Sequence, residues 1–140
     1  MGERSVTRWR RAMLSISATA AVMAAALIGG PGAGAAQAAP SGQPDPGIPF
    51  SSVVYGTGCA YSLTVPVNSV GMVSFYEQRK GFPPIFIGKT PAYQLSATVI
   101  WVPRHLGDRT LYAVQNGQKS PTTVARVHQG YGSGGLCFAL

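Results

Sequence analysis

Short β-branched and aromatic runs, broken by turn residues about every ten positions, constrain the fold of this chain more than any other feature. After residue 39 no window repeats its apolar residues with the period of a helix. The chain's 18 Gly and 11 Pro are also too frequent for long helices. Residues 61–67 place an apolar side chain at every second position. These patterns predict an all-β sandwich.

The runs predict about seven strands, over residues 50–55, 59–67, 71–77, 84–89, 93–102, 109–115 and 122–128. Pro83 and Pro84 favour an edge position for the fourth strand, because proline cannot donate to a central ladder. Asn116-Gly117 is a strong turn signal. The inward positions predict a core of Leu63, Val65, Val73, Phe75, Val99, Trp101, Leu111 and Ala113.

The start of the chain has the layout of a secretory signal peptide over residues 1–38. A basic start precedes an Ala-rich apolar run over residues 12–28, and Ala36-Gln37-Ala38 is a small-x-small pattern. We expect cleavage between Ala38 and Ala39, secretion to the extracellular side and no stable membrane insertion afterwards. An uncleaved anchor is the alternative, but the run is short for a membrane span. Arg10-Arg11 leaves a twin-arginine route open beside the general one.

The rest of the chain divides by composition into two parts. Residues 39–49 form a Pro/Gly-rich stretch without the apolar side chains needed for packing, so we expect a flexible spacer. Residues 50–140 carry the strand pattern and end in a Gly-rich tail, over residues 130–135, that we expect to be flexible and that leads to Cys137. The length suits one domain with one core.

Cys59 and Cys137 are the only cysteines. An even count in a small exported domain predicts a disulfide. In the chain-entropy model a loop of this length is worth about 4 kcal/mol. Two free thiols or a pair of metal ligands are the alternatives, although cysteines without neighbouring histidines make a poor metal site.

Charge after residue 39 is moderately positive and scattered, with seven Lys and Arg against three Asp and Glu. Scattered charge is typical of a solubilising surface. A nucleic-acid site needs a basic stripe with aromatic platforms, and we expect no nucleic-acid binding. Weak attraction to anionic cell-wall polymers or lipid headgroups stays open.

Few groups in the chain are suited to catalysis. His105 and Asp108 are close in sequence and could meet a serine, with candidates at Ser51, Ser52 and Ser62, but we interpret the pair as a polar turn. Glu77 is interpreted as a turn charge and His128 as a surface residue. We therefore expect no enzyme, no cofactor and no metal.

Three aromatic residues are out of phase with their inward neighbours and should lie on outer faces. They are Tyr76, Phe86 and Tyr112. Exposed aromatic residues gathered on one surface can mark a binding patch. We treat these three as a candidate binding surface.

Several ordered motifs resemble a bacterial Ig-like domain of secreted and surface proteins. They are GMVSFY at residues 71–76, ATVIWVP at 97–103, GDRTLYA at 107–113 and SPTTV at 120–124. The resemblance covers about residues 58–128 and implies an Ig-like β-sandwich. In that topology the second strand begins at the end where the last strand finishes, so Cys59 and Cys137 should meet there, unlike the inter-sheet disulfide of antibody domains.

The resemblance favours a non-catalytic interaction or structural module, monomeric, with an unknown protein, glycan or cell-envelope component as partner. A second hypothesis is a carrier of a small apolar ligand, with a pocket lined by Phe82, Phe86 and Tyr112. A third is a protease inhibitor that presents the loop at residues 81–84 or 103–107. Fold alone does not decide among them.

Overall fold

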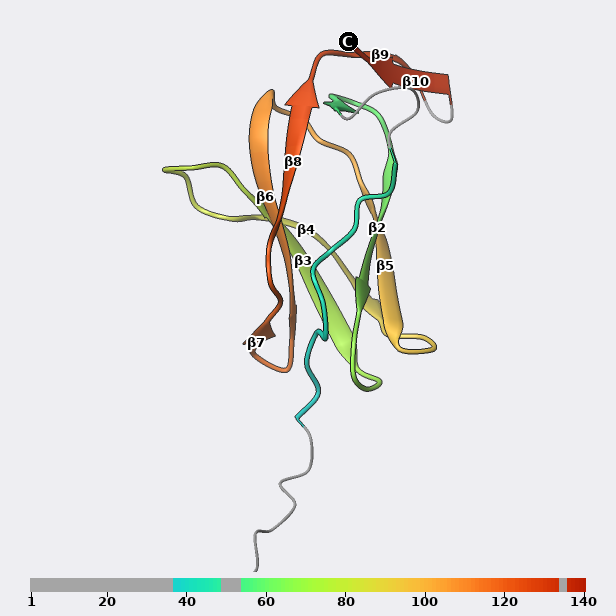
Figure 1. The fold of residues 1–140 in the computed structure, drawn as a ribbon, viewed down its shortest axis with the longest axis vertical. Coiled ribbons are helices and arrows are strands. Elements are labelled where there is room, and N and C mark those ends of the chain that lie inside the picture. Colours follow the sequence, from blue (N-terminus) through green and yellow to red (C-terminus); the bar gives the residue numbers. More distant parts are fainter. Residues whose placement is uncertain (1–36, 49–53, 134–135) are drawn as a thin grey trace, which may run out of the picture. The chain divides into compact units, whose positions relative to one another are not determined.

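The computed structural model describes residues 37–48, 54–133 and 136–140. Within these ranges the fold is all-β and contains no helix (Figure 1). The strands are β1 (Tyr55–Gly56), β2 (Tyr61–Pro66), β3 (Met72–Gln78), β4 (Ile85–Pro91), β5 (Ser96–Trp101), β6 (Gly107–Gln115), β7 (Gln118–Lys119), β8 (Thr123–His128), β9 (Gly130–Ser133) and β10 (Leu136–Ala139).

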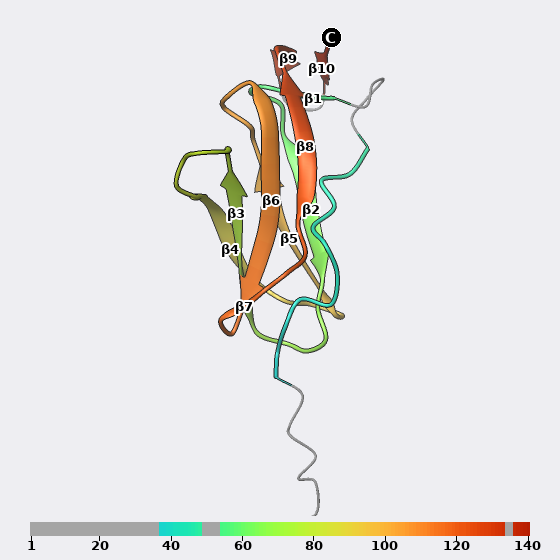
Figure 2. The same ribbon diagram turned by 60° about the vertical axis from the view of Figure 1, so that its left-hand side comes forward.

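The strands form one large sheet and two small ones. The large sheet has the order β1-β8-β6-β3-β4, with β7 paired to β6. A second sheet pairs β2 with β5, and β9 pairs with β10 in a hairpin. All pairings are antiparallel except β1 with β8, which run parallel. Figure 1 shows β2 and β5 to the right of β3, β6 and β8, and Figure 2 shows β6 and β8 running side by side.

The core draws side chains from both main sheets. Leu63 and Val65 of β2 pack in one apolar cluster with Phe75 of β3 and Leu111 of β6. This follows from strand alternation, which sends every second side chain to the same face. Seven of the eight residues predicted for the core are buried, and Val99 is partly buried against the same cluster. Burying each large apolar side chain contributes roughly 1.5–3 kcal/mol.

A β-bulge interrupts the pairing of β3 with β4. Phe75 lies opposite Gly88, but the next residue, Tyr76, lies opposite Phe86, so Ile87 has no partner in the register. Bulges bend a strand and increase its twist. The β3–β4 connection, over residues 79–84, projects beyond the sheet in Figure 1. The edge position predicted for the fourth strand matches β4, which is the last strand of the large sheet.

The segment predicted to be a flexible spacer is paired instead. The Asp45 amide donates to the Thr64 carbonyl at 2.7 Å, and the Thr64 amide donates back at 2.8 Å. Pro44 and Pro46 are buried. The stretch therefore lies along the free edge of β2, and its prolines supply packing that its composition did not indicate. Residue 49 lies outside the described residues.

The predicted cleavage site lies partly within the structure. The Ala39 amide donates to Asn68 Oδ1 at 2.8 Å, and the Asn68 amide donates to the Ala39 carbonyl at 3.0 Å. The basic and apolar parts of the predicted signal peptide, through residue 36, lie outside the described residues. In the part of the chain that the structure describes, there is no helix with the length and apolar character needed to cross a membrane.

The Gly-rich tail also differs from its prediction, because it forms the hairpin β9–β10 rather than a loose connection. Residues 134 and 135, which come between β9 and β10 in the sequence, lie outside the described residues. Of the predicted first strand, over residues 50–55, the structure describes residues 54 and 55, and Tyr55 begins β1. The predicted turn at Asn116-Gly117 is confirmed, since both residues have positive φ and connect β6 to β7.

Candidate functional site

Two neighbouring cavities lie beside the β5–β6 connection, at residues 102–106. The larger is bounded by residues of β3, β4 and β5, and the smaller by the β3–β4 loop, at residues 79–84. Their volumes are about 390 and 280 Å³, and both are lined by Ile85 and His105. We call the two together the loop groove. The larger cavity is lined by Glu77, Ile85, Phe86, Ile87, Ile100, Trp101, Val102, Arg104 and His105, and the smaller by Arg79, Phe82, Pro83, Ile85, His105 and Arg109.

Glu77 lies in the larger cavity of the groove and is 5% exposed. Its Oε2 accepts a hydrogen bond of 2.6 Å from the Trp101 indole Nε1. The interpretation of Glu77 as a turn charge is therefore wrong. The period-two alternation that buries Val73 and Phe75 continues to Glu77, and this continuation is the sequence signal that could have predicted its inward direction.

Arg109 lies in the smaller cavity and is 1% exposed. Its Nε donates to the His105 carbonyl at 3.2 Å, and its Nη2 donates to the Leu106 carbonyl at 2.6 Å. No carboxylate among the described residues lies within ion-pair distance of this guanidinium. Arg109 precedes Leu111 and Ala113 on the inner face of β6, so the same alternation is the sequence signal for its burial.

The groove walls are apolar and open to solvent. Ile85, Phe86, Ile100 and Val102 are all at least 40% exposed, although each is a large hydrophobic residue. Arg79 lies at the outer end, where its guanidinium carbon is 3.3 Å from the centre of the Phe82 ring. Gathered exposed apolar side chains beside polar groups are typical of binding sites.

The three aromatic residues predicted as a binding surface do come together, on the outer face of the large sheet. The Tyr76 ring lies 5.2 Å from Tyr112 in a stacked arrangement and 5.6 Å from Phe86. Lys119 Nζ lies 3.8 Å from the Tyr112 ring centre. Tyr112 is only 7% exposed, and burial, followed by the charge of Tyr76, raises its pKa. Neighbours thus cover much of the ring, and the cluster is chiefly a set of cross-strand contacts.

The other residues predicted for ligand binding or catalysis are separated. Phe86 and Phe82 line the two adjacent cavities of the groove, whereas Tyr112 lines neither. His105 lies in the groove, but the Asp108 carboxylate is 3.6 Å from Arg126 on the exposed surface. Ser62 lies on β2, and Ser51 and Ser52 lie outside the described residues.

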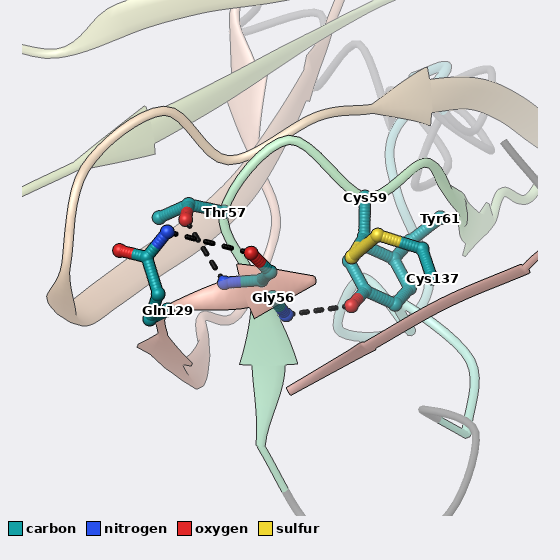
Figure 3. Close-up of a disulfide and its surroundings, with 7 residues drawn as sticks. Gly56, Thr57, Cys59, Tyr61, Gln129 and Cys137 are labelled. Carbon is teal, nitrogen blue, oxygen red and sulfur yellow. Dashed lines mark hydrogen bonds between the residues drawn. A yellow bond between two sulfur atoms is a disulfide. The ribbon is translucent and has the colours of Figure 1, made fainter. Parts of the chain in front are cut away.

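At the end of the fold near β9 and β10, the predicted disulfide between Cys59 and Cys137 is confirmed, with Cα atoms 5.5 Å apart (Figure 3). The Gly56 amide donates to the Tyr61 hydroxyl at 2.6 Å beside it. A side chain at Gly56 would collide with Cys59 Sγ, so glycine is required at this close approach. The disulfide thus fastens β10 to the start of β2.

His128, predicted as a surface residue, is partly buried, and its Nδ1 lies 2.7 Å from the Leu140 carbonyl. In the part of the chain that the structure describes, no three His, Cys, Asp or Glu side chains gather as metal ligands.

Comparisons with known proteins give one distant structural match. No protein-family model and no curated protein matches the chain. A solved structure that matches is a superoxide reductase (neelaredoxin) from Ignicoccus hospitalis. Its identity is 16% and its TM-score 0.47, and the match covers 64% of this chain and 83% of that chain.

This match corrects the expectation that the chain is not an enzyme. The matched chain is named as an enzyme, which contradicts a prediction made from the scarcity of catalytic groups, and we withdraw that prediction. The similarity transfers no activity, substrate or metal to this chain, because its identity and TM-score are too low to support an argument about function.

Proposed function

We propose that this protein is an exported, Ig-like interaction module that binds its ligand in the loop groove. Export is supported by the basic start, the apolar run and the small-x-small pattern of residues 36–38. The disulfide is compatible with an oxidising location outside the cytoplasm. The packing of β2 and β5 against β3, β6 and β8 supports an Ig-like sandwich, as do the motifs that resemble that family.

The observation that carries the binding role is the composition of the loop groove. Its walls expose large apolar residues to solvent. The side chains of Glu77 and Arg109, which also line the groove, are buried. Ligand sites commonly combine apolar walls with a few placed polar groups. Both loops considered for protease inhibition flank this groove, so they serve here as its walls.

The groove also favours a second candidate, a carrier of a small ligand. The larger cavity, at about 390 Å³, falls in the range of small-molecule sites. A module that recognises a protein, a glycan or a cell-envelope component would use the groove together with its rim, whereas a carrier would hold a small molecule within it.

Native mass spectrometry of the protein recovered from the culture medium of its own cells tests both parts of the proposal. The expected species is the chain from residue 39 onward, less two hydrogens, with an additional mass that is lost on denaturation. Ile85→Asp should remove the additional mass, because it places a charge in the apolar wall. Val70→Asp changes an exposed apolar residue in the β2–β3 loop, outside the groove, and should leave it bound.

The size of the released mass separates the two candidates, since a macromolecular partner and a small carried ligand differ clearly. A bound mass that survives Ile85→Asp would contradict the groove as the site. Absence of the protein from the medium would contradict export.

A further inference from the structure

We propose that the smaller cavity of the loop groove binds a carboxylate that is joined to an apolar group, with Arg109 as its principal contact. This inference rests on the proposed function and specifies the chemistry of the ligand. It starts from a charged side chain that is almost fully buried and lines a cavity.

Arg109 is buried without a counter-ion among the described residues. Its two hydrogen bonds run from Nε and Nη2 to main-chain carbonyls, and the structure shows none from Nη1 to any described residue. Arginine stays charged in proteins, and a buried charge is costly unless it is paired. An anion in the cavity would supply the missing pair.

The surrounding charges favour an anion at this place. Arg79 and His105 line the same cavity, and no acidic residue among the described ones lines it. Arg104, which is exposed, lines the adjoining cavity. The nearest inward carboxylate, Glu77, lines that larger cavity, so its repulsion would keep an anionic group on the Arg109 side of Ile85.

The walls determine the rest of the ligand. Phe82, Pro83 and Ile85 line the smaller cavity, and the exposed Phe86 and Ile100 continue the apolar surface into the larger one. An inorganic anion would leave these walls in water. A carboxylate fits the planar guanidinium in a paired geometry, and an attached apolar chain would cover the walls.

Isothermal titration calorimetry with octanoate tests the proposal on the protein purified with its disulfide intact. Octanamide, which has the same chain without the charge, and acetate, which has the charge without the chain, should each bind at least roughly tenfold more weakly. A short apolar peptide with a free carboxyl end, compared with its amidated form, shows whether a peptide end can supply the same group.

Arg79→Gln should weaken octanoate binding roughly tenfold, because it removes a cation beside the cavity without disturbing the buried Arg109. Arg126→Gln is the matched control, since Arg126 is an exposed arginine on β8 away from the groove, and should leave binding unchanged. Arg109→Gln should abolish binding, with its folding checked by the hydrogen exchange of core amides.

Three results would overturn the proposal: no octanoate or peptide binding, equal binding of octanoate and octanamide, or equal losses from Arg79→Gln and Arg126→Gln. If octanoate and the peptide both fail while Ile85→Asp still releases a ligand in mass spectrometry, the groove remains the site and only the carboxylate is excluded. If octanoate binds but no ligand accompanies the exported protein, the proposed function fails and the site remains.

Discussion

At the scale of single residues, the bond between Trp101 and Glu77 joins the core to the groove. The Trp101 indole is buried, and its Nε1 hydrogen satisfies a carboxylate that is itself 5% exposed. Removing the indole donor would leave the buried carboxylate without its partner. The free-energy cost of that unpaired group exceeds the net contribution of the intact hydrogen bond.

We expect Trp101→Phe to lower the free energy of unfolding by about 2–3 kcal/mol, from the lost bond and the smaller ring. A double-mutant cycle with Glu77→Leu, which has no acceptor for the indole, measured by urea unfolding, isolates the bond from the change in ring size. The expected coupling energy is about 1–3 kcal/mol. A coupling below about 0.5 kcal/mol would show that the two side chains act independently.

Tyr55 has a raised pKa, caused first by burial and then by the charges of Asp45 and Tyr61. Its hydroxyl donates to the Gly47 carbonyl at 2.8 Å, a bond that requires the phenol proton. The folded protein therefore holds this proton more tightly than the unfolded chain does. The stability that results is complete below pH 10 and is lost as pH rises through the folded-state pKa.

Urea unfolding of Tyr55→Phe over this alkaline range should show a smaller decline in stability than the wild type shows. Tyr93→Phe, which removes an exposed phenol from the β4–β5 turn, is the matched control. If Tyr55→Phe loses stability above pH 10 as steeply as the wild type, the phenol proton contributes nothing to folding.

At the scale of elements, the turn between β4 and β5 has an unusual sequence for its geometry. Gln94 and Leu95 have φ values of 47° and 63°, and Tyr93 and Ser96 exchange two main-chain hydrogen bonds. Turns with positive φ at both central positions favour Asn-Gly, because other residues meet steric strain there.

Replacing Gln94 and Leu95 together by Asn and Gly should raise the free energy of unfolding by about 1 kcal/mol, because the strain is relieved. Leu95 is 57% exposed, so little buried area is lost. The β6–β7 turn offers a reverse control, since it already contains Asn116 and Gly117, and Gly117→Ala should destabilise by about 1 kcal/mol. A destabilised Asn-Gly variant would show that the Leu95 side chain contributes more than the strain costs.

The segment that contains Asp45 pairs with the free edge of β2, so we expect it to be ordered in solution. Native-state hydrogen exchange should show slow exchange at the amides of Asp45 and Thr64, which donate to each other's carbonyls. The amide of Ile48, whose side chain is 95% exposed, is an internal reference for the end of the segment. Equally fast exchange at Asp45 and Ile48 would support the flexible spacer that composition predicted.

The elements that sequence patterns predicted well are those whose signal is local. Alternation in β2 and β6 indicated Leu63, Val65 and Leu111 as buried, and Asn116-Gly117 indicated its turn. Pairings between distant residues were not predictable in the same way. Glu77 resembled a turn charge because Arg79 and Lys80 follow it, and its partner Trp101 lies 24 positions away on β5, although the alternation of β3 does point it inward.

The loop groove was likewise beyond local patterns, since two loops and a bulge in β4 build it. Phe82 and Phe86 were predicted to line a pocket with Tyr112, but Tyr112 stacks on Tyr76 and lies against Lys119, and it lines neither cavity of the groove. Composition also favoured a loose tail over residues 130–135, whereas the hairpin β9–β10 depends on pairing that glycine content does not reveal.

At the scale of the whole molecule, the disulfide closes most of the described chain into one loop. Cys59 and Cys137 are 78 positions apart. In the chain-entropy model, Cys59→Ser with Cys137→Ser should lower the free energy of unfolding by about 4 kcal/mol. Adding a reducing agent should shift the urea midpoint of the wild type and leave that of the double variant unchanged. A wild-type midpoint that does not respond to reduction would contradict a stabilising role.

The same closure changes what a single break in the main chain can do. The projecting β3–β4 loop, at residues 79–84, lies between the two cysteines, so a protease that nicks it leaves a covalent ring opened at one point and heavier by one water. Both pieces stay attached through Cys59 and Cys137, and the strands on either side keep their partners. A fragment can leave only after a second nick or after reduction.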